Sequence, residues 1–219
     1  MKSKATVLSI VSIIGAFLLA LVATSPVRAV KPIINPQVLS IAENSPNGSS
    51  PTPSKIAAFD PEQGGANLTY DVISGDGAAA FDVNASTGVV TVADSSLLDF
   101  EVKTSFTMLV RVTDLEPQSD EAIITINVTD VSDLPPVMGD QTFSVAENSP
   151  AGTTVGTLVY SDGDSNDSHT FDITGGNGDG VFNIDSVGKI TVANGVQLDF
   201  EDVNTYNMTV EIEDEGGQT

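Results

Sequence analysis

Short segments of alternating apolar and polar residues run along most of the chain after residue 30; residues 68–72, 106–112 and 122–128 are examples. Successive side chains of a strand point to opposite faces, so each segment has one apolar and one polar face. Gly, Asn, Asp and Pro separate the segments, as is typical of turns. About seven short strands in each hundred residues predict an antiparallel β-sandwich.

The pattern occurs twice, at a spacing of about 100 residues, which is typical of an independent domain. Residues 40–46 (SIAENSP) match residues 144–150 (SVAENSP). Residues 98–101 and 198–201 are both LDFE. These collinear matches indicate a duplicated domain and predict an all-β chain of two tandem sandwiches.

The boundary between the two copies falls at Pro135-Pro136, because proline cannot extend a central strand and stiffens a connection. We therefore predict repeat one over residues 30–134 and repeat two over residues 135–219. Thr219 aligns near Ser119, so repeat two lacks the last strand of repeat one. An open edge of this kind is a site of aggregation or strand addition, which leaves two interpretations: a longer repeat array, or a strand supplied by a partner.

The N-terminus has the layout of a secretory signal. Lys2 and Lys4 precede an apolar run over residues 7–22, and Val27-Arg28-Ala29 forms a small-residue cleavage site. The run is short for a membrane-spanning helix, which needs about 20 apolar residues. We expect a signal helix over residues 1–29, cleavage after Ala29, and a secreted or cell-surface protein. A retained N-terminal anchor, or a region beyond Thr219, is the alternative route to the membrane.

Charge and composition narrow the classes of function. The chain has 30 acidic and 8 basic residues and a net charge of −22, which argues against nucleic-acid partners because phosphates attract Lys and Arg. Self-repulsion on this scale destabilises a compact state unless cations offset it. The chain has no Cys and one histidine, His169, which no nucleophile pattern flanks. We expect no enzymatic activity.

Acidic motifs follow one another in a fixed order: residues 42–44 (AEN), 98–101 (LDFE) and 130–136 (DVSDLPP), then Asp162-Gly163-Asp164 and Asp214. Together these motifs resemble the ligand motifs of cadherin repeats, and the resemblance covers residues 31–219. It implies two tandem Greek-key β-sandwiches, related to the immunoglobulin fold, with calcium ions at their junction.

Calcium takes six to eight oxygen ligands, often carboxylates. Asp99 and Glu101 are two residues apart, so in an extended segment both side chains point to one side and Phe100 points to the other. The resemblance implies one inter-repeat calcium site with these ligands: Glu43, Asp99, Glu101, Asp130, Asp133, Asp162, Asp164 and Asp214.

Some positions depart from the family pattern. In the family such a junction holds up to three calcium ions. Ser132 stands where the family usually has Asn, and its hydroxyl is a poorer ligand than an amide, so the ion on the repeat-two side has the least support. Asp60-Pro61-Glu62 replaces the Asp-x-Asp motif in repeat one. We expect the outer half-sites, Asp60 with Asp114 and Glu147 with Asp199 and Glu201, to bind calcium weakly.

The resemblance implies a module for calcium-dependent cell adhesion, homophilic or toward other cell-surface ligands, in which calcium makes the junction rigid. The family's strand exchange anchored by Trp is not expected, because the chain has no Trp. The alternative function is a passive spacer or carbohydrate-binding module of a larger secreted enzyme or adhesin.

Overall fold

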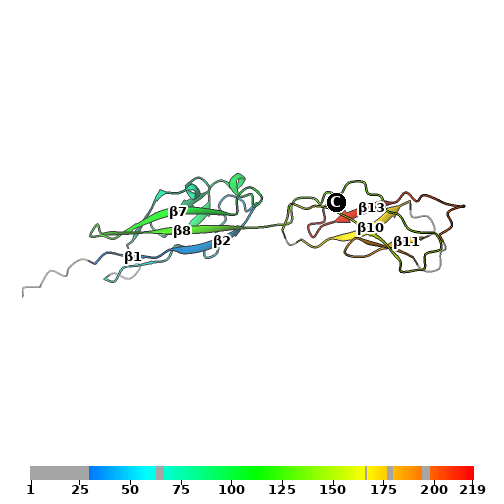
Figure 1. The fold of residues 1–219 in the computed structure, drawn as a ribbon. Helices are drawn as coiled ribbons and strands as arrows, with labels where there is room; N and C mark the ends of the chain where they lie inside the picture. The colour runs from blue at the N-terminus through cyan, green and yellow to red at the C-terminus, as the bar shows by residue number, and fades with distance from the viewer. Residues whose placement is uncertain (1–29, 63–66, 166, 177–179, 194–197) are drawn as a thin grey trace, which may run out of the picture.

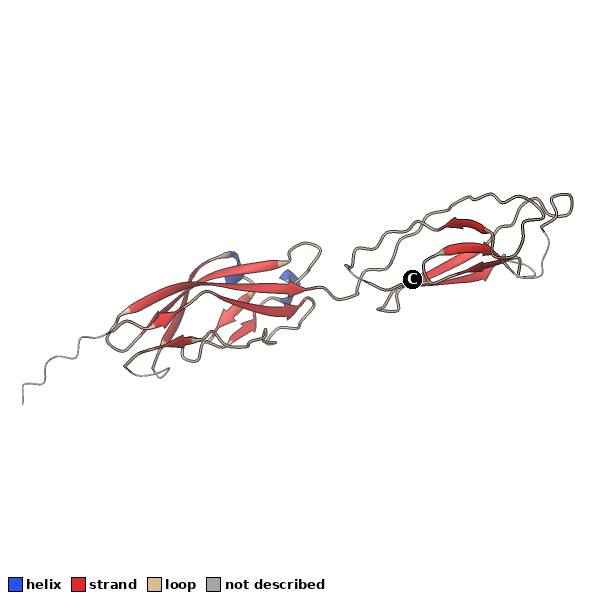
Figure 2. Ribbon diagram, turned by 60° about the horizontal axis from the view of Figure 1, so that its bottom comes forward, coloured by secondary structure: helices blue, strands red, loops and turns tan. Residues whose placement is uncertain are grey.

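A computed structural model describes residues 30–62, 67–165, 167–176, 180–193 and 198–219. Two β-rich bodies lie end to end and are joined by one short connection (Figure 1, Figure 2). The predicted signal sequence, residues 1–29, lies outside the described residues. No helix in the described ranges is long and apolar enough to cross a bilayer.

Repeat one is built from β-strands and two single-turn 3-10 helices, η1 and η2. Their bounds are β1 (Ile33–Ile34), β2 (Gln37–Ala42), β3 (Ala58–Phe59), β4 (Thr69–Ser74), η1 (Asp76–Ala78), β5 (Phe81–Val83), β6 (Val90–Val92), η2 (Ser95–Leu97), β7 (Ser105–Thr113) and β8 (Ser119–Thr129). One sheet has the order β2-β8-β7-β4, and the pairs β5-β6 and β1-β3 complete the repeat. The β2-β8 pair is parallel and the other pairs are antiparallel. A parallel pair needs a long connection, and most of repeat one separates these two strands.

The core of repeat one follows from the alternation of apolar residues. Met108 and Val110 of β7 lie opposite Ile124 and Ala122 of β8, and all four side chains are buried. The intervening residues face outward, so the sheet has one buried face. Burial of this face is the main source of stability.

Repeat two repeats most of this arrangement. Its strands are β9 (Thr154–Thr157), β10 (Thr170–Gly175), β11 (Phe182–Ile184), β12 (Lys189–Val192) and β13 (Thr209–Glu213). The pair β10-β13 corresponds to β4-β7, and β11-β12 corresponds to β5-β6, with β9 added at the edge of β12. Apolar side chains of both sheets form a second, smaller core.

The described part of repeat two has no strand in the place of β8. Strand β13 pairs with β10 alone, and residues 141–146, which match β2, form no strand. Phe143 exposes 36% of its surface, whereas Leu39 at the matching position exposes none. Met208 is only partly buried, whereas its counterpart Met108 is fully buried. The absence of a neighbouring strand therefore leaves this edge of the core partly uncovered.

We predict that truncating the two matching methionines has unequal effects. Met108→Ala opens a cavity in a closed core and should lower the stability of repeat one by about 2–5 kcal/mol. Met208→Ala should cost less than half as much, because solvent already reaches that side chain. Native-state hydrogen exchange of the β7 and β13 amides measures the two repeats separately. Equal losses would contradict the assignment of Met208 to an uncovered edge.

Candidate metal centre at the junction of the repeats

Glu43 organises the end of repeat one that faces repeat two. It follows β2 directly and exposes only 3% of its surface. Its Oε2 accepts a hydrogen bond from the Phe100 amide at 2.6 Å, and its Oε1 accepts one from the Val131 amide at 2.8 Å. One buried carboxylate therefore holds the LDFE segment and the inter-repeat linker together.

The LDFE segment presents two more acids beside Glu43. Leu98 is buried and Phe100 packs against the core of repeat one, which leaves Asp99 and Glu101 on the outer side. Asp99 Oδ1 accepts a hydrogen bond from the Val102 amide at 2.9 Å. Carboxylate oxygens of Glu43, Asp99 and Glu101 all lie within 4.8 Å of one another.

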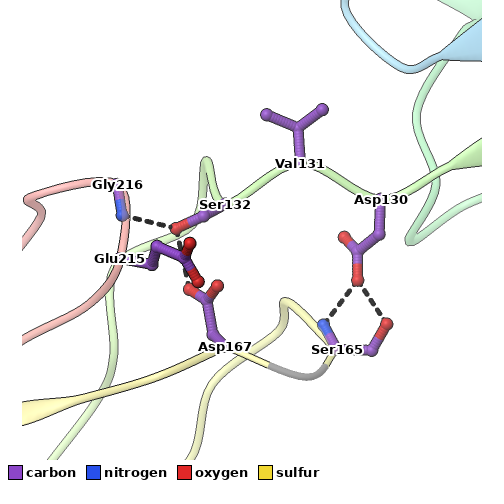
Figure 3. A pocket seen from close by; sticks show the side chains of 7 residues that line it. All are labelled: Asp130, Val131, Ser132, Ser165, Asp167, Glu215 and Gly216. Carbon is purple, nitrogen blue, oxygen red and sulfur yellow. Dashed lines mark hydrogen bonds between the residues drawn. The ribbon is translucent and has the colours of Figure 1, made fainter.

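The linker contributes two acids that face different partners. Asp130 Oδ2 accepts hydrogen bonds from the amide and the hydroxyl of Ser165 in repeat two (Figure 3). Asp133 Oδ2 accepts a hydrogen bond from the side-chain amide of Asn44 in repeat one. The other oxygen of each carboxylate, Asp130 Oδ1 and Asp133 Oδ1, is buried without a hydrogen-bond partner in the described residues.

Repeat two contributes Asp164 and Asp214, each of which exposes 6% of its surface. Asp164 Oδ2 accepts hydrogen bonds from the amides of Asp133 and Leu134, both at 2.9 Å. Asp214, just after β13, accepts a 2.7 Å hydrogen bond from the Gln218 amide at Oδ1. Asp164 Oδ1 and Asp214 Oδ2 are buried and have no hydrogen-bond partner in the described residues.

The acids form three overlapping clusters that run from one repeat to the other. Within each cluster, ligand oxygens lie within 4.8 Å of one another; the clusters are Glu43-Asp99-Glu101, Glu101-Asp133-Asp164 and Asp164-Asp167-Asp214. Glu101 and Asp164 each belong to two clusters. The junction is therefore a continuous row of carboxylates.

Asp162 differs from the other predicted ligands. Its Oδ1 accepts the Asp164 amide hydrogen bond at 3.1 Å, and its Oδ2 lies 2.7 Å from Nε2 of His169. Burial raises the pKa of the Asp162 carboxyl, but hydrogen bonds from His169 and the Asp164 amide outweigh it, so the pKa lies below its ordinary value. Both oxygens of Asp162 are already engaged, and its closest cluster contains Asp167 and His169.

The surroundings of Glu101 disfavour its charged form. Burial raises the pKa of Glu101, and the negative charges of Glu43, Asp130 and Asp164 raise it further, although a backbone hydrogen bond opposes them. The described Lys and Arg ion pairs lie elsewhere, on Asp120, Asp76 and Glu121. No basic side chain in those pairs neutralises the junction.

The residues fit a hard divalent cation. Four carboxylates of the junction each keep one buried oxygen without a partner while their other oxygen is hydrogen-bonded; they are Asp130, Asp133, Asp164 and Asp214. Burying an unpaired charged oxygen is costly. Calcium takes several such oxygens at once, so the donor set and its unpartnered oxygens suit this ion.

The outer acidic sets are less complete. Glu147, Asp199 and Glu201 lie within ligand distance of one another, but all three are exposed. Asp114 is buried like Asp214, and its Oδ1 accepts amide hydrogen bonds from Glu116 and Gln118. No three-ligand cluster of the described residues includes it. The first set matches the acids that repeat one contributes to the junction, and Asp114 matches Asp214 of repeat two. Among the described residues, neither faces acids of another repeat.

Sequence reasoning did not identify Asp167 and His169 as parts of this centre. Asp167 lies beside Ser132 in a cavity between the linker and two loops of repeat two (Figure 3). Its signal in the sequence was weak: one more acid in the loop after Asp162-Gly163-Asp164. The sequence showed of His169 only that no nucleophile pattern flanks it; its side chain is 7% exposed and lies against Asp162.

Comparisons with known proteins agree with this architecture. The sequence model of the cadherin domain matches residues 37–129 and 141–219. Human protocadherin Fat 1 is 32% identical over 158 residues, which are 69% of this chain and 3% of that protein. Human cadherin-12 is 33% identical over 190 residues, which are 78% of this chain and 23% of that protein. The chain thus spans a small part of these relatives.

A solved structure supports the fold independently. The ectodomain of human desmocollin-1 superposes with a TM-score of 0.69 at 21% identity, over 83% of this chain and 37% of that one. At this identity the likeness concerns the fold: an all-β chain of tandem sandwiches. Two matched domains, the ordered acidic motifs and this fold together show that the chain belongs to the cadherin family.

Proposed function

We propose that this chain is a calcium-binding module of an exported or cell-surface protein and that it acts in calcium-dependent adhesion. The observation that carries the proposal is the row of overlapping carboxylate clusters that joins the repeats, in which four buried oxygens have no hydrogen-bond partner among the described residues. The proposed ligands are Glu43, Asp99, Glu101, Asp130, Asp133, Asp164 and Asp214, with Asp162 as an outer member held by His169.

The residues of this chain hold the ligand oxygens in place before any ion binds. Main-chain amides of Phe100 and Val131 fix Glu43, and those of Asp133 and Leu134 fix Asp164. A bound calcium ion supplies positive charge and coordination positions for the remaining oxygens. The same oxygens come from two repeats and the linker, so their shared coordination opposes bending at the junction.

A rigid junction gives the function its physical basis. An array that bends at each linker presents its surface in many orientations, and binding then costs the entropy of fixing one of them. A rod presents the surface in one orientation. Membership of the cadherin family supports adhesion as the role of that surface, with other cadherin repeats or cell-surface ligands as partners. We infer no catalytic role.

Calcium should stabilise the protein through this junction. At a free calcium concentration 100 times Kd, one site adds about 2.7 kcal/mol of stability, which raises Tm by about 5–10 °C. Thermal unfolding of chelator-treated protein, with and without added calcium, measures the shift. Glu101→Ala should remove most of it, because Glu101 belongs to two of the clusters.

The matched control for this variant is Glu201→Ala. Glu201 occupies the same place in the LDFE motif of repeat two, but its cluster is exposed and has no opposing repeat. The calcium shift of this control should equal that of the unchanged protein. Equal shifts in both variants would show that calcium acts elsewhere than at the junction.

Without calcium, Glu101→Gln should be more stable than the unchanged protein, and with calcium it should be less stable. The raised pKa of Glu101 means that the folded state disfavours its charge. The gain in stability should therefore be complete at pH 7 and vanish as the pH falls through the raised pKa toward the ordinary value of 4.5. Chemical denaturation over this pH range, with and without a chelator, measures the change in the free energy of unfolding under both conditions. A variant that is less stable under both conditions contradicts the prediction.

A further inference from the structure

The hydroxyl of Ser132 is directed at a neighbouring acid. It donates a 2.7 Å hydrogen bond to Asp167 Oδ2 and accepts one at 2.8 Å from the amide of Gly216 (Figure 3). Gly216 lies so close that a Cβ there would come within 2.7 Å of the Ser132 carbonyl oxygen. The backbone thus fixes Ser132, and Ser132 fixes one oxygen of Asp167.

Asp167 lies in a cluster whose other members have oxygens to spare. Its carboxylate is within 4.8 Å of ligand oxygens of Asp164 and Asp214. Each of those side chains is more than nine-tenths buried, with one oxygen on backbone amides and the other without a partner in the described residues. Two buried unpartnered carboxylate oxygens beside a third carboxylate are costly to leave uncompensated, and a cation offsets that cost.

Asp162 is poorly placed to serve this cluster, because its two oxygens are taken by the Asp164 amide and by His169. His169 stands at the position of Leu68 in repeat one, where a buried apolar side chain makes no such bond. The acid that remains available on this loop is Asp167.

We propose that Asp167 is a direct ligand of a divalent cation held with Asp164 and Asp214 on the repeat-two side of the junction, and that Ser132 is the positioning residue that aims it. This inference rests on the proposed function. It names ligands for the calcium ion nearest repeat two, which has the least support from the sequence. The carboxylate of Asp167 supplies the charged oxygen that the Ser132 hydroxyl does not.

The test is calcium titration of chelator-treated protein by calorimetry, comparing the unchanged chain with Asp167→Asn. The variant should lose one bound calcium ion, or bind it at least tenfold more weakly, and keep the others. Asp172→Asn is the matched control: it removes the same charge from an exposed position of β10 in the same repeat. It should bind like the unchanged chain. Ser132→Ala should keep the number of ions and weaken one of them several-fold.

Asn has the size of Asp and still accepts the hydrogen bond from Ser132, so the variant should fold. Without calcium, its melting temperature should equal or exceed that of the unchanged chain, because one charge leaves an acidic cluster. A clearly lower value would show that Asp167 is only a structural acceptor and would overturn the proposal. Calcium binding identical to that of Asp172→Asn would overturn it as well.

The same titration separates this inference from the proposed function. If the unchanged chain binds calcium and Glu101→Ala loses an ion, but Asp167→Asn keeps all of them, only the role of Asp167 is wrong. If the unchanged chain binds no calcium, both proposals fail.

Discussion

Mutual repulsion of carboxylates at the junction is the constraint on which the rest of this structure depends. The core of repeat one buries its own apolar face, and the core of repeat two does so except at its open edge. The junction differs, because Asp133 and Asp164 meet there with one oxygen each buried and without a partner. Backbone amides hold the Asp164 carboxylate and the side-chain amide of Asn44 holds that of Asp133, so rotating either side chain away would break these hydrogen bonds. The calcium ion that we propose would relieve this repulsion and would make the geometry of the junction depend on calcium.

Each repeat carries two acidic sets, one at the end that faces the next repeat and one at the end that faces the preceding repeat. Among the described residues, two such sets meet only at the junction of repeat one with repeat two. In the set that faces the next repeat, Glu43 accepts a hydrogen bond from the Phe100 amide. In repeat two, Glu147 accepts the matching hydrogen bond from the Phe200 amide at 3.2 Å. In the set that faces the preceding repeat, Asp214 accepts a hydrogen bond from the Gln218 amide. In repeat one, Asp114 accepts the matching hydrogen bond from the Gln118 amide. Duplication of the domain therefore brings the two acidic sets of the proposed metal centre together at the interface between the repeats.

Much of the fold could be read from the sequence because local rules dominate it. Alternation along β7 and β8 predicts their buried faces, and the duplicated motifs predict the second sandwich. The acids of the LDFE motif could be assigned to one side because an extended segment alternates. The parallel pairing of β2 with β8 could not be predicted from the sequence, since it depends on which edge of the sheet β2 reaches.

The details of the site were harder to predict for a similar reason. The engagement of Asp162 by His169 depends on the packing of a side chain that replaces a buried leucine. The position of Asp167 depends on how Ser132 and Gly216 approach each other across the junction. Ser132 and Gly216 are 84 residues apart, so no spacing rule along the chain predicts their contact. Asp162 and His169 are only seven residues apart, but they lie in a loop, where no regular period sets which side chains meet.

The most direct test of the central claim is the relative orientation of the two repeats, measured by residual dipolar couplings of backbone amides with and without calcium. With calcium, both repeats should report one common alignment tensor, as a rigid rod requires. After chelation, each repeat should remain folded but report its own tensor. Couplings that are unchanged by calcium, in protein that stays folded throughout, would contradict the account.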